Sequence, residues 1–325
     1  MKAVVYHKYG APGVLRVENV AEPTPKPNQI LIKVHAAEVT KGDCELRSFN
    51  FPVKWFSIPL RLAFGVFKPR KKILGGYFSG EVVAVGGKVT RFEGGERVFG
   101  ATKLLMGAYA EYMAVPETYT IAPMPVNVSF EAAATVPLGG LNALHFLRLA
   151  KIQTGETLLV NGAGGSIGTY AVQIAKTMGA EVTAVDSDLK REMLLSLGTD
   201  HFIDYRQQDF RKDDKKYDVI FDMLASSPLD ESITALNAGG RYISANPTFK
   251  KMTSAKRVQK KTGKTLIFAF AGETLEELLT LKQMIEDEKI RPTVDRIFSM
   301  EQAVEAHERV EAEQRLGCTA ISMIS

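Results

Sequence analysis

A glycine-rich segment provides the most specific chemistry in the sequence. Residues 157–176 read TLLVNGAGGSIGTYAVQIAK, so an apolar strand pattern passes through four glycines directly into a helical pattern. Glycines at such a junction permit a tight turn and a close approach of the backbone to a pyrophosphate, which then meets unpaired N–H groups of the helix. Strand, turn, helix and second strand follow in the required order, which predicts a dinucleotide site. Its expected residues are Gly162, Gly164, Gly165, Ser166, Ile167 and Gly168.

Asp186 and the residues after it should select the dinucleotide. Asp186 ends the second strand pattern and follows Gly162 at about the 20-residue distance of an acidic residue that binds the adenosine ribose, which favours NAD. Ser187, Lys190 and Arg191 come next and can instead serve the 2′-phosphate of NADP. Lys190 and Arg191 also fit a solvated helix face. The residues alone leave both cofactors open.

Alternating strand and helix patterns surround this segment. Helices are expected over residues 138–149, 167–178, 189–197 and 229–238, and strands over residues 157–160, 181–185, 202–203, 219–221 and 241–244. The alternation predicts βαβ units and a parallel sheet. Further along, the sequence predicts a helix over 274–288, a strand over 293–298, a helix over 300–312 and a strand over 319–323.

The pattern is different before about residue 128. Short apolar runs such as Ile30–Val34 alternate with glycine pairs and proline clusters, which predicts a β-rich region with irregular connections. A length of 325 residues corresponds to about two domains. The sequence therefore predicts an α/β protein with a doubly wound Rossmann sheet and a second, β-rich domain.

The composition is that of a globular protein, with 45% hydrophobic and 24% charged residues. It excludes disorder, collagen and a coiled coil for the chain as a whole, and the net charge of +4 is too small to predict nucleic-acid binding. Two cysteines, Cys44 and Cys318, are too few for a disulfide framework or a four-cysteine zinc lobe. No stretch of 18 apolar residues predicts a membrane span, and residues 1–6 do not form a secretory leader, so we expect a cytoplasmic protein.

Five segments in the correct order carry a family resemblance. They are MKAVVYHKYGAPGVLRVENV at residues 1–20, GAYAEYMAVP at 107–116, AAATVPLGGLNAL at 132–144, GTDHFIDY at 198–205 and IRPTVDRIFSMEQAVEAHERVE at 290–311. Through them the chain resembles, from end to end, the zinc-independent quinone oxidoreductase branch of the medium-chain dehydrogenase/reductase superfamily.

The resemblance implies a fold, an assembly and a substrate class. A GroES-like, partly barrel-like catalytic domain would comprise residues 1–124 and 266–325, and a Rossmann cofactor-binding domain would comprise residues 125–265. The family further implies a homodimer, and small hydrophobic quinones or α,β-unsaturated carbonyls (enones) as substrates.

The resemblance also implies pocket residues. Zinc dehydrogenases of the superfamily carry metal ligands where this chain has Thr40 and Gly76-Tyr77, so no metal is expected. The quinone reductase branch carries Asn-x-x-Asp-x-x-x-Arg, which is Thr40, Asp43 and Arg47 here. Asp43 and Arg47 either contact the substrate or form an ion pair that stabilises the fold. The pocket candidates are Thr40, Asp43, Tyr77 and Asn142, the last beside the nicotinamide amide, and no residue is identified as the proton donor.

The same family comparison bears on the cofactor. Relatives that use NADPH place a Ser or Thr, a Lys and a Tyr where this chain has Ser187, Lys190 and Tyr205. Asp186 departs from that pattern, because a carboxylate beside a phosphate is repulsive. Three matches against one departure favour NADP, and NAD stays possible because of Asp186.

Two further segments are unusual. Residues 49–72 end in four cations. Three alternatives are expected for this segment: a lid over an apolar substrate, a subdomain packed on the barrel, or a membrane-surface helix. Their aromatic side chains are Phe49, Phe51, Trp55, Phe56, Phe64 and Phe67. Residues 250–264 contain seven cations. This segment is expected either to be a solvated helix or loop, or to bind RNA or the phosphates of an acyl-CoA. Cys44 has no evident histidine partner and is not expected to be a nucleophile, and His307 is expected to be structural.

The sequence therefore predicts a zinc-independent, NADPH-dependent oxidoreductase that transfers hydride to quinones or enones. One alternative is a 2-enoyl thioester (acyl-CoA) reductase. The other is a non-catalytic protein that binds NADPH or RNA, like the lens crystallins of this branch.

Overall fold

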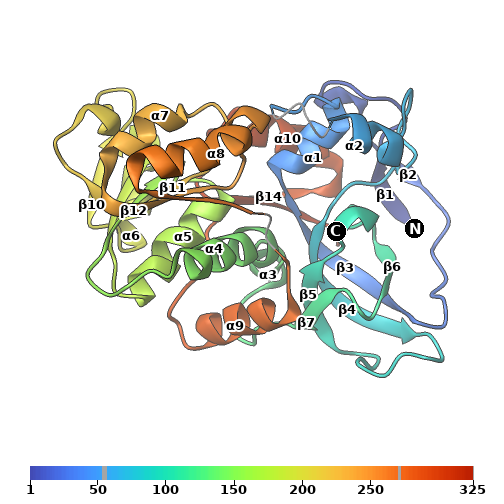
Figure 1. Ribbon diagram of the computed structural model, residues 1–325. Coiled ribbons are helices and arrows are strands. Elements are labelled where there is room, and N and C mark those ends of the chain that lie inside the picture. The colour runs from blue at the N-terminus through green and yellow to red at the C-terminus, as the bar shows by residue number, and fades with distance from the viewer. Residues whose placement is uncertain (53–56, 270–271, 325) are drawn as a thin grey trace. The chain divides into compact units, whose positions relative to one another are not determined.

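The computed structural model describes residues 1–52, 57–269 and 272–324, so Trp55 and Phe56 of the aromatic segment lie outside the described residues. The chain divides into two compact units (Figure 1). Unit 1 comprises Met1–Phe51, Ser57–Leu138 and Glu273–Ser325, and unit 2 comprises Pro52–Phe56 and Gly139–Gly272. The α/β class predicted from the sequence is confirmed.

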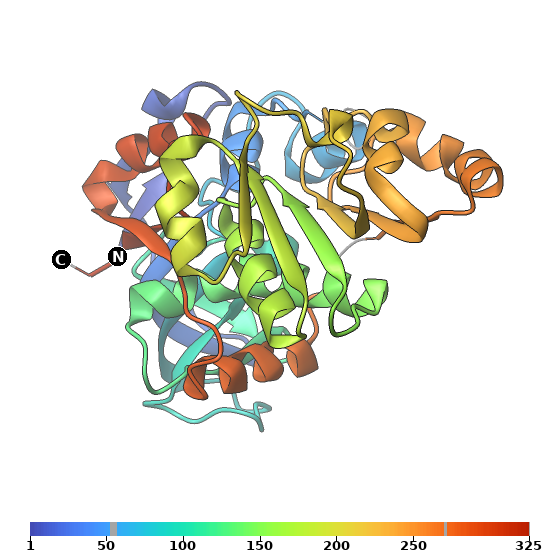
Figure 2. The ribbon, with the colours of Figure 1, turned by 90° about the vertical axis from the view of Figure 1, so that its left-hand side faces the viewer.

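Unit 2 is built on a parallel sheet (Figure 2). In the described residues its strand order is β10-β9-β8-β11-β12-β13, and all these neighbours are parallel. The strands are β8 (Thr157–Asn161), β9 (Glu181–Asp186), β10 (His201–Asp204), β11 (Tyr217–Asp222), β12 (Leu236–Ser244) and β13 (Thr265–Phe268). From β8 the chain adds β9 and β10 on one side of the sheet, and it then returns to add β11, β12 and β13 on the other side. Rossmann domains show the same change of side. The apolar sequences of β8 and β9 match their almost complete burial.

Five helices of the described residues precede or connect these strands. They are α4 (Val136–Ala150), α5 (Ser166–Thr177), α6 (Arg191–Ser196), α7 (Leu229–Ser232) and α8 (Phe249–Thr262). The helix predicted over 229–238 is wrong in its second half, because Leu236 already opens β12 and pairs with Tyr217 of β11. The basic segment forms α8, which Thr248 caps at its start and a left-handed Gly263 ends. β13 lies where no strand was expected from the sequence.

Unit 1 joins both ends of the chain in one sheet. Within the described residues its strands follow the order β14-β15-β3-β4-β5-β7, and β6 also pairs with β3. They are β3 (Gln29–Val39), β4 (Tyr77–Val85), β5 (Arg97–Ala101), β6 (Tyr112–Pro116), β7 (Thr120–Pro123), β14 (Val294–Ser299) and β15 (Cys318–Ser322). A separate antiparallel pair consists of β1 (Lys2–Val5) and β2 (Arg16–Asn19). Because Thr319 of β15 pairs with Val39 of β3, this unit is discontinuous in the sequence.

The helices described in unit 1 are α1 (Lys41–Ser48), α2 (Ser57–Phe64), α3 (Phe130–Ala134), α9 (Leu275–Glu286) and α10 (Ala303–Glu311). Phe130 of α3 stacks on His35 of β3 with ring centroids 3.8 Å apart, and its carbonyl accepts a hydrogen bond from Ser79 of β4 at 2.6 Å. Unit 1 therefore extends past residue 124, the domain boundary expected from the sequence.

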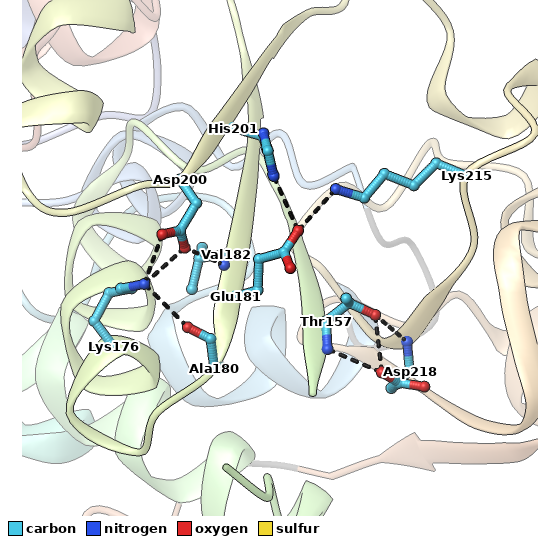
Figure 3. A network of polar contacts seen from close by, with 9 residues as sticks. All are labelled: Thr157, Lys176, Ala180, Glu181, Val182, Asp200, His201, Lys215 and Asp218. Atoms are coloured by element: carbon cyan, nitrogen blue, oxygen red, sulfur yellow. Dashed lines mark hydrogen bonds and ion pairs between the residues drawn. The ribbon is translucent and has the colours of Figure 1, made fainter. Parts of the chain in front are cut away.

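A polar network supports the amino-terminal edge of the sheet of unit 2 (Figure 3). Asp200 accepts from the Val182 N–H at 2.7 Å and pairs with Lys176 at 2.7 Å. The other members are Thr157, Ala180, Glu181, His201, Lys215 and Asp218. Thr157, Glu181 and His201 stand at the first positions of β8, β9 and β10, so the network braces the sheet at the edge opposite the glycine-rich loop.

Candidate functional site

The glycine-rich loop joins β8 to α5 at the carboxyl edge of the sheet. Gly162 has a φ of +87°, which L side chains rarely adopt, and its N–H donates to the Val185 carbonyl of β9 at 3.0 Å. A Cβ on Gly168 would lie 2.4 Å from the carbonyl oxygen of Ala163, so α5 packs directly against the loop. Gly165 precedes α5 without a capping side chain, so an anion can take the place of one. The loop fits the pyrophosphate of a dinucleotide.

Replacing Gly168 with alanine is expected to weaken dinucleotide binding about tenfold. Overpacking of this kind costs about 1–3 kcal/mol, and about 1.4 kcal/mol corresponds to a factor of ten in affinity. The clash with Ala163 is relieved by moving α5 away from the loop, which misplaces the N–H groups that face the phosphates. Isothermal titration with NADPH measures the effect. Gly94→Ala is the control, because its Cβ would meet no described atom within 4 Å, and an equal affinity in both variants would contradict the prediction.

Asp186 occupies the corner between the loop and the end of β9. Its Oδ2 accepts from the Gly164 N–H at 2.8 Å, and its Oδ1 accepts from the Ser187 N–H at 2.8 Å. The ammonium of Lys190 lies 3.1 Å from Oδ1, and all three side chains of this corner are buried. The Asp186 carboxylate therefore holds the loop and neutralises the Lys190 ammonium. Asp186, which favours NAD, and Lys190, which favours NADP, thus form an ion pair with each other.

Tyr205 lies next to this corner. Its N–H donates to the Asp186 carbonyl at 3.2 Å, and its ring is 56% exposed. The exposed Arg206 follows it, and a hydrogen bond with Tyr205 raises the pKa of the guanidinium. Arg206 was not expected as a cofactor residue from the sequence. Its position just after β10, the strand beside β9, is the signal that could have identified it. Arg191 points elsewhere: it pairs with Asp188 at 2.6 Å and covers the Phe202 ring.

Thr40 and Asp43 form the capping box of α1. Asp43 Oδ2 accepts from the Thr40 N–H at 3.0 Å and from its hydroxyl at 2.7 Å, while the Asp43 N–H donates to Thr40 Oγ1 at 3.0 Å. Asp43 Oδ1 accepts from the Gly75 N–H at 3.1 Å. Burial raises the pKa of Asp43, which these hydrogen bonds partly offset. Both oxygens of this carboxylate are used to build the fold.

Arg47, expected as a possible partner of Asp43, instead reaches α10. Its guanidinium donates to Glu311 Oε1 at 2.5 Å and to the Gly10 carbonyl at 3.1 Å. The same guanidinium lies 3.2 Å from His307 Nδ1. The Arg47 side chain is only 1% exposed. This ion pair therefore ties α1 to α10 across the sequence.

Cys44 has a histidine neighbour that the sequence analysis missed. Its Sγ lies 3.3 Å from Nδ1 of His307 on α10. Burial raises the pKa of the thiol to about 12, while burial and the Arg47 charge lower the pKa of His307 to about 3. Both groups are neutral near pH 7, so the pair is not an activated nucleophile, in line with the expectation for Cys44.

Tyr77 begins β4 and contacts a residue from the other end of unit 1. Its hydroxyl donates to Glu273 Oε1 at 2.9 Å. Burial raises the pKa of both groups, and the neighbouring carboxylate raises that of the phenol further. Glu273 has a positive φ of 44°, and its carbonyl accepts from the Thr120 hydroxyl. The half-buried Glu273 was not expected from the sequence, because it lies 196 residues from Tyr77.

Asn142 lies on α4, half-buried. Three residues before it, a Cβ on Gly139 would lie 2.4 Å from the Ser166 carbonyl oxygen. α4 therefore packs closely on the first turn of α5, and Asn142 stands one turn along the same face.

Comparisons with known proteins agree with this architecture. Residues 26–126 match the alcohol dehydrogenase GroES-like domain, and residues 197–319 match the family described as zinc-binding dehydrogenase. Quinone oxidoreductase of Sus scrofa is 31% identical over 330 residues, covering 95% of this chain and 94% of that protein. The chain belongs to the quinone oxidoreductase branch of the medium-chain dehydrogenase/reductase superfamily.

Two further relatives of this oxidoreductase extend the comparison. The NADPH-dependent alkenal/one oxidoreductase, chloroplastic, of Arabidopsis thaliana is 32% identical over 306 residues, covering 91% of this chain and 72% of that protein. The solved quinone oxidoreductase of Coxiella burnetii superposes with a TM-score of 0.87 at 29% identity, covering 99% of both chains.

The described residues form neither a cluster of metal ligands nor a membrane-spanning helix. In the described ranges, no group of three or more His, Cys, Asp or Glu side chains is arranged to hold a metal ion. Every helix within the described residues is too short or too polar to cross a membrane.

The seven cations of residues 250–264 divide into two groups. Lys251 and Lys264 turn inward, and their ammonium groups donate to carbonyls, Lys251 to Leu224 at 3.3 Å and Lys264 to Leu236 at 3.0 Å. The exposed cations are Lys250, Lys256, Arg257, Lys260 and Lys261. Most of this segment is therefore a solvated helix face, and two of its lysines anchor it.

Proposed function

We propose that the protein is an NADPH-dependent reductase of quinones and enones. The observation that carries the proposal is the dinucleotide loop with Ser187, Lys190 and Tyr205 at its corner, in a chain of the quinone oxidoreductase branch. The names of the Sus scrofa and Arabidopsis thaliana relatives support the substrate class and NADPH.

The residues of this chain bind and orient the reactants. The loop amides would hold the pyrophosphate, and the Asn142 amide would bond the nicotinamide carboxamide. When bound, the cofactor supplies a hydride from C4 of its nicotinamide ring. Catalysis by the protein then comes mainly from proximity and orientation of the two reactants.

Tyr77 is our candidate for the proton donor. Hydride addition to the β-carbon of an enone leaves an enolate, and the Tyr77 O–H would donate its proton to the α-carbon. The resulting phenolate takes a proton from water. Burial and the Glu273 carboxylate raise the pKa of Tyr77, so the phenol holds its proton at neutral pH.

Lys190→Met tests the preference for NADPH. The methionine keeps an aliphatic side chain against Gly164 but removes the charge, so kcat/KM for NADPH should fall about tenfold or more while that for NADH changes little. Asp186→Ser should raise the NADPH-to-NADH ratio, because it frees Lys190 from its partner. Steady-state kinetics with both cofactors measure the ratio. Lys176→Met at the opposite edge of the sheet is the control, and an equal loss for both cofactors in K190M would contradict phosphate recognition.

A substrate panel tests the reaction itself. Loss of NADPH absorbance is measured with quinones, enones and 2-enoyl-CoA thioesters of graded size. Oxidation with quinones or enones is expected. Oxidation with the thioesters alone would favour the acyl-CoA alternative, and none with any compound would overturn the reductase proposal.

We also propose a cytoplasmic homodimer. The observation that supports the homodimer is β13, an outermost strand of the sheet of unit 2 among the described residues, whose free edge offers backbone groups for pairing with a second copy. Size-exclusion chromatography with light scattering would give twice the chain mass, and a monomer at micromolar concentration would contradict the proposal.

A further inference from the structure

Apolar side chains on α2 and the turn after it are exposed to solvent on unit 1. Figure 1 shows the position of α2 in the fold. Ile58 and Leu62 lie one helical turn apart, so they share a face, and they are 73% and 62% exposed. Phe67, in the turn, is 94% exposed. Val66 and Leu104 are 44% and 61% exposed, and we call these five residues the Phe67 surface. Contiguous exposed apolar groups of this kind usually mark an interaction site.

The turn that carries Phe67 is tightly built. The Arg70 N–H donates to the Phe64 carbonyl at 2.7 Å, and the Tyr9 hydroxyl donates to the Gly65 carbonyl at 2.8 Å. Gly65 has a φ of +120°, and a Cβ there would lie 2.0 Å from a backbone oxygen. Phe64 is buried beneath the turn. Phe67 is therefore held outward by an ordered scaffold.

Cations fasten the neighbouring segments to one another. The Arg61 guanidinium donates to the Val66 carbonyl at 2.9 Å, and the Arg70 guanidinium donates to the Leu62 carbonyl at 3.1 Å. The Lys71 ammonium donates to the carbonyls of Leu104 and Leu105. The members of the Phe67 surface thus come from two segments that direct contacts hold together.

The segment that carries most of this surface has charges of one sign. Between Glu45 and Glu81 the sequence contains no acidic residue, and its cations are Arg47, Lys54, Arg61, Lys68, Arg70, Lys71 and Lys72. Of these, Lys68, Arg70 and Lys72 are exposed near the apolar tip. Such a combination attracts an anionic partner with an apolar interior.

We propose that the Phe67 surface binds the face of an anionic phospholipid bilayer. Phe67, Leu62 and Ile58 enter the headgroup region, while Lys68, Arg70 and Lys72 contact lipid phosphates. A bilayer is favoured over an acidic protein because the aromatic tip projects from a turn and is almost fully exposed, as a wedge into lipid requires. The proposal does not depend on the reductase function.

Sedimentation of the full-length protein with vesicles tests it. Phosphatidylglycerol–phosphatidylcholine vesicles should bind the protein, pure phosphatidylcholine vesicles should bind it far less, and salt should weaken the binding. The double variant Leu62→Ser, Phe67→Ser should reduce vesicle affinity about tenfold, since the apolar anchor is lost. Lys68→Glu with Lys72→Glu should abolish the preference for the anionic vesicles.

Matched variants keep the result interpretable. Val126→Ser removes an apolar side chain that is 83% exposed on the same unit, and should bind vesicles like the wild type. All variants should keep the wild-type melting temperature, because the altered side chains are exposed. Equal vesicle binding by the double variant and wild type, or no binding by the wild type, would overturn the proposal. A fall in molecular mass of the double variant would also overturn it, since the surface would then contact a second copy.

Discussion

Replacing Arg47 with methionine is expected to lower the free energy of unfolding by about 3 kcal/mol, which urea denaturation measures. The methionine keeps much of the buried volume but leaves Glu311 and the Gly10 carbonyl without their guanidinium partner. The loss is strongly destabilising because the guanidinium side is buried: the Gly10 carbonyl loses its donor, while Glu311, which is 36% exposed, loses its cation. The effect should therefore appear in stability, and the KM for substrate should be nearly unchanged at a temperature where both proteins are folded.

Lys41→Met is the control for Arg47. It breaks the Lys41–Glu313 pair, which also joins the start of α1 to the region after α10 but is exposed, at 44% and 57% for the two side chains. Such pairs contribute about 0–1 kcal/mol. If R47M lost no more stability than K41M and instead raised the substrate KM, Arg47 would be a substrate contact.

Replacing Tyr77 with phenylalanine is expected to lower kcat for enone reduction about 100-fold, because a positioned general acid typically contributes 10²- to 10⁴-fold. The exchange removes one hydroxyl and its hydrogen bond to Glu273, and keeps the ring. The KM for NADPH should not change, since Tyr77 is not among the residues that line the dinucleotide loop. The solvent deuterium isotope effect on kcat should rise in the variant as water becomes the proton source.

Tyr112→Phe, on β6, is the matched control and should keep wild-type kcat. A wild-type kcat in Y77F would show that the proton comes from solvent in the native enzyme as well. A lower melting temperature without a change in kcat would make the Tyr77–Glu273 contact a purely structural one.

Local sequence was sufficient to predict the backbone geometry of the glycine-rich loop. Gly162 is required by its positive φ, and Gly168 is required because α5 approaches the backbone of Ala163 closely. Both requirements arise within a few residues of the chain. The partners of Asp186 are also close in sequence, at Gly164, Ser187 and Lys190. Short-range geometry of this kind leaves a recognisable spacing of residue types.

The contacts of unit 1 could not be predicted in the same way. His307 is 263 residues from Cys44, and Glu273 is 196 residues from Tyr77. Each of these pairs exists only because the C-terminal segment returns to the sheet formed by the first part of the chain. Thr40 and Asp43 are different, since their spacing is that of a capping box, and helix capping was a signal for their structural role.

The pairing of β15 with β3 has a consequence for the order in which the protein folds during synthesis. Residues 318–322 leave the ribosome after all the strands of unit 2, so one edge of β3 has no partner strand until they are synthesised. Unit 2, whose sheet is continuous between residues 157 and 268, can complete its strands earlier. Domains generally fold as units during translation. A nascent chain released before residue 318 should therefore retain a folded unit 2, while the sheet of unit 1 lacks β15.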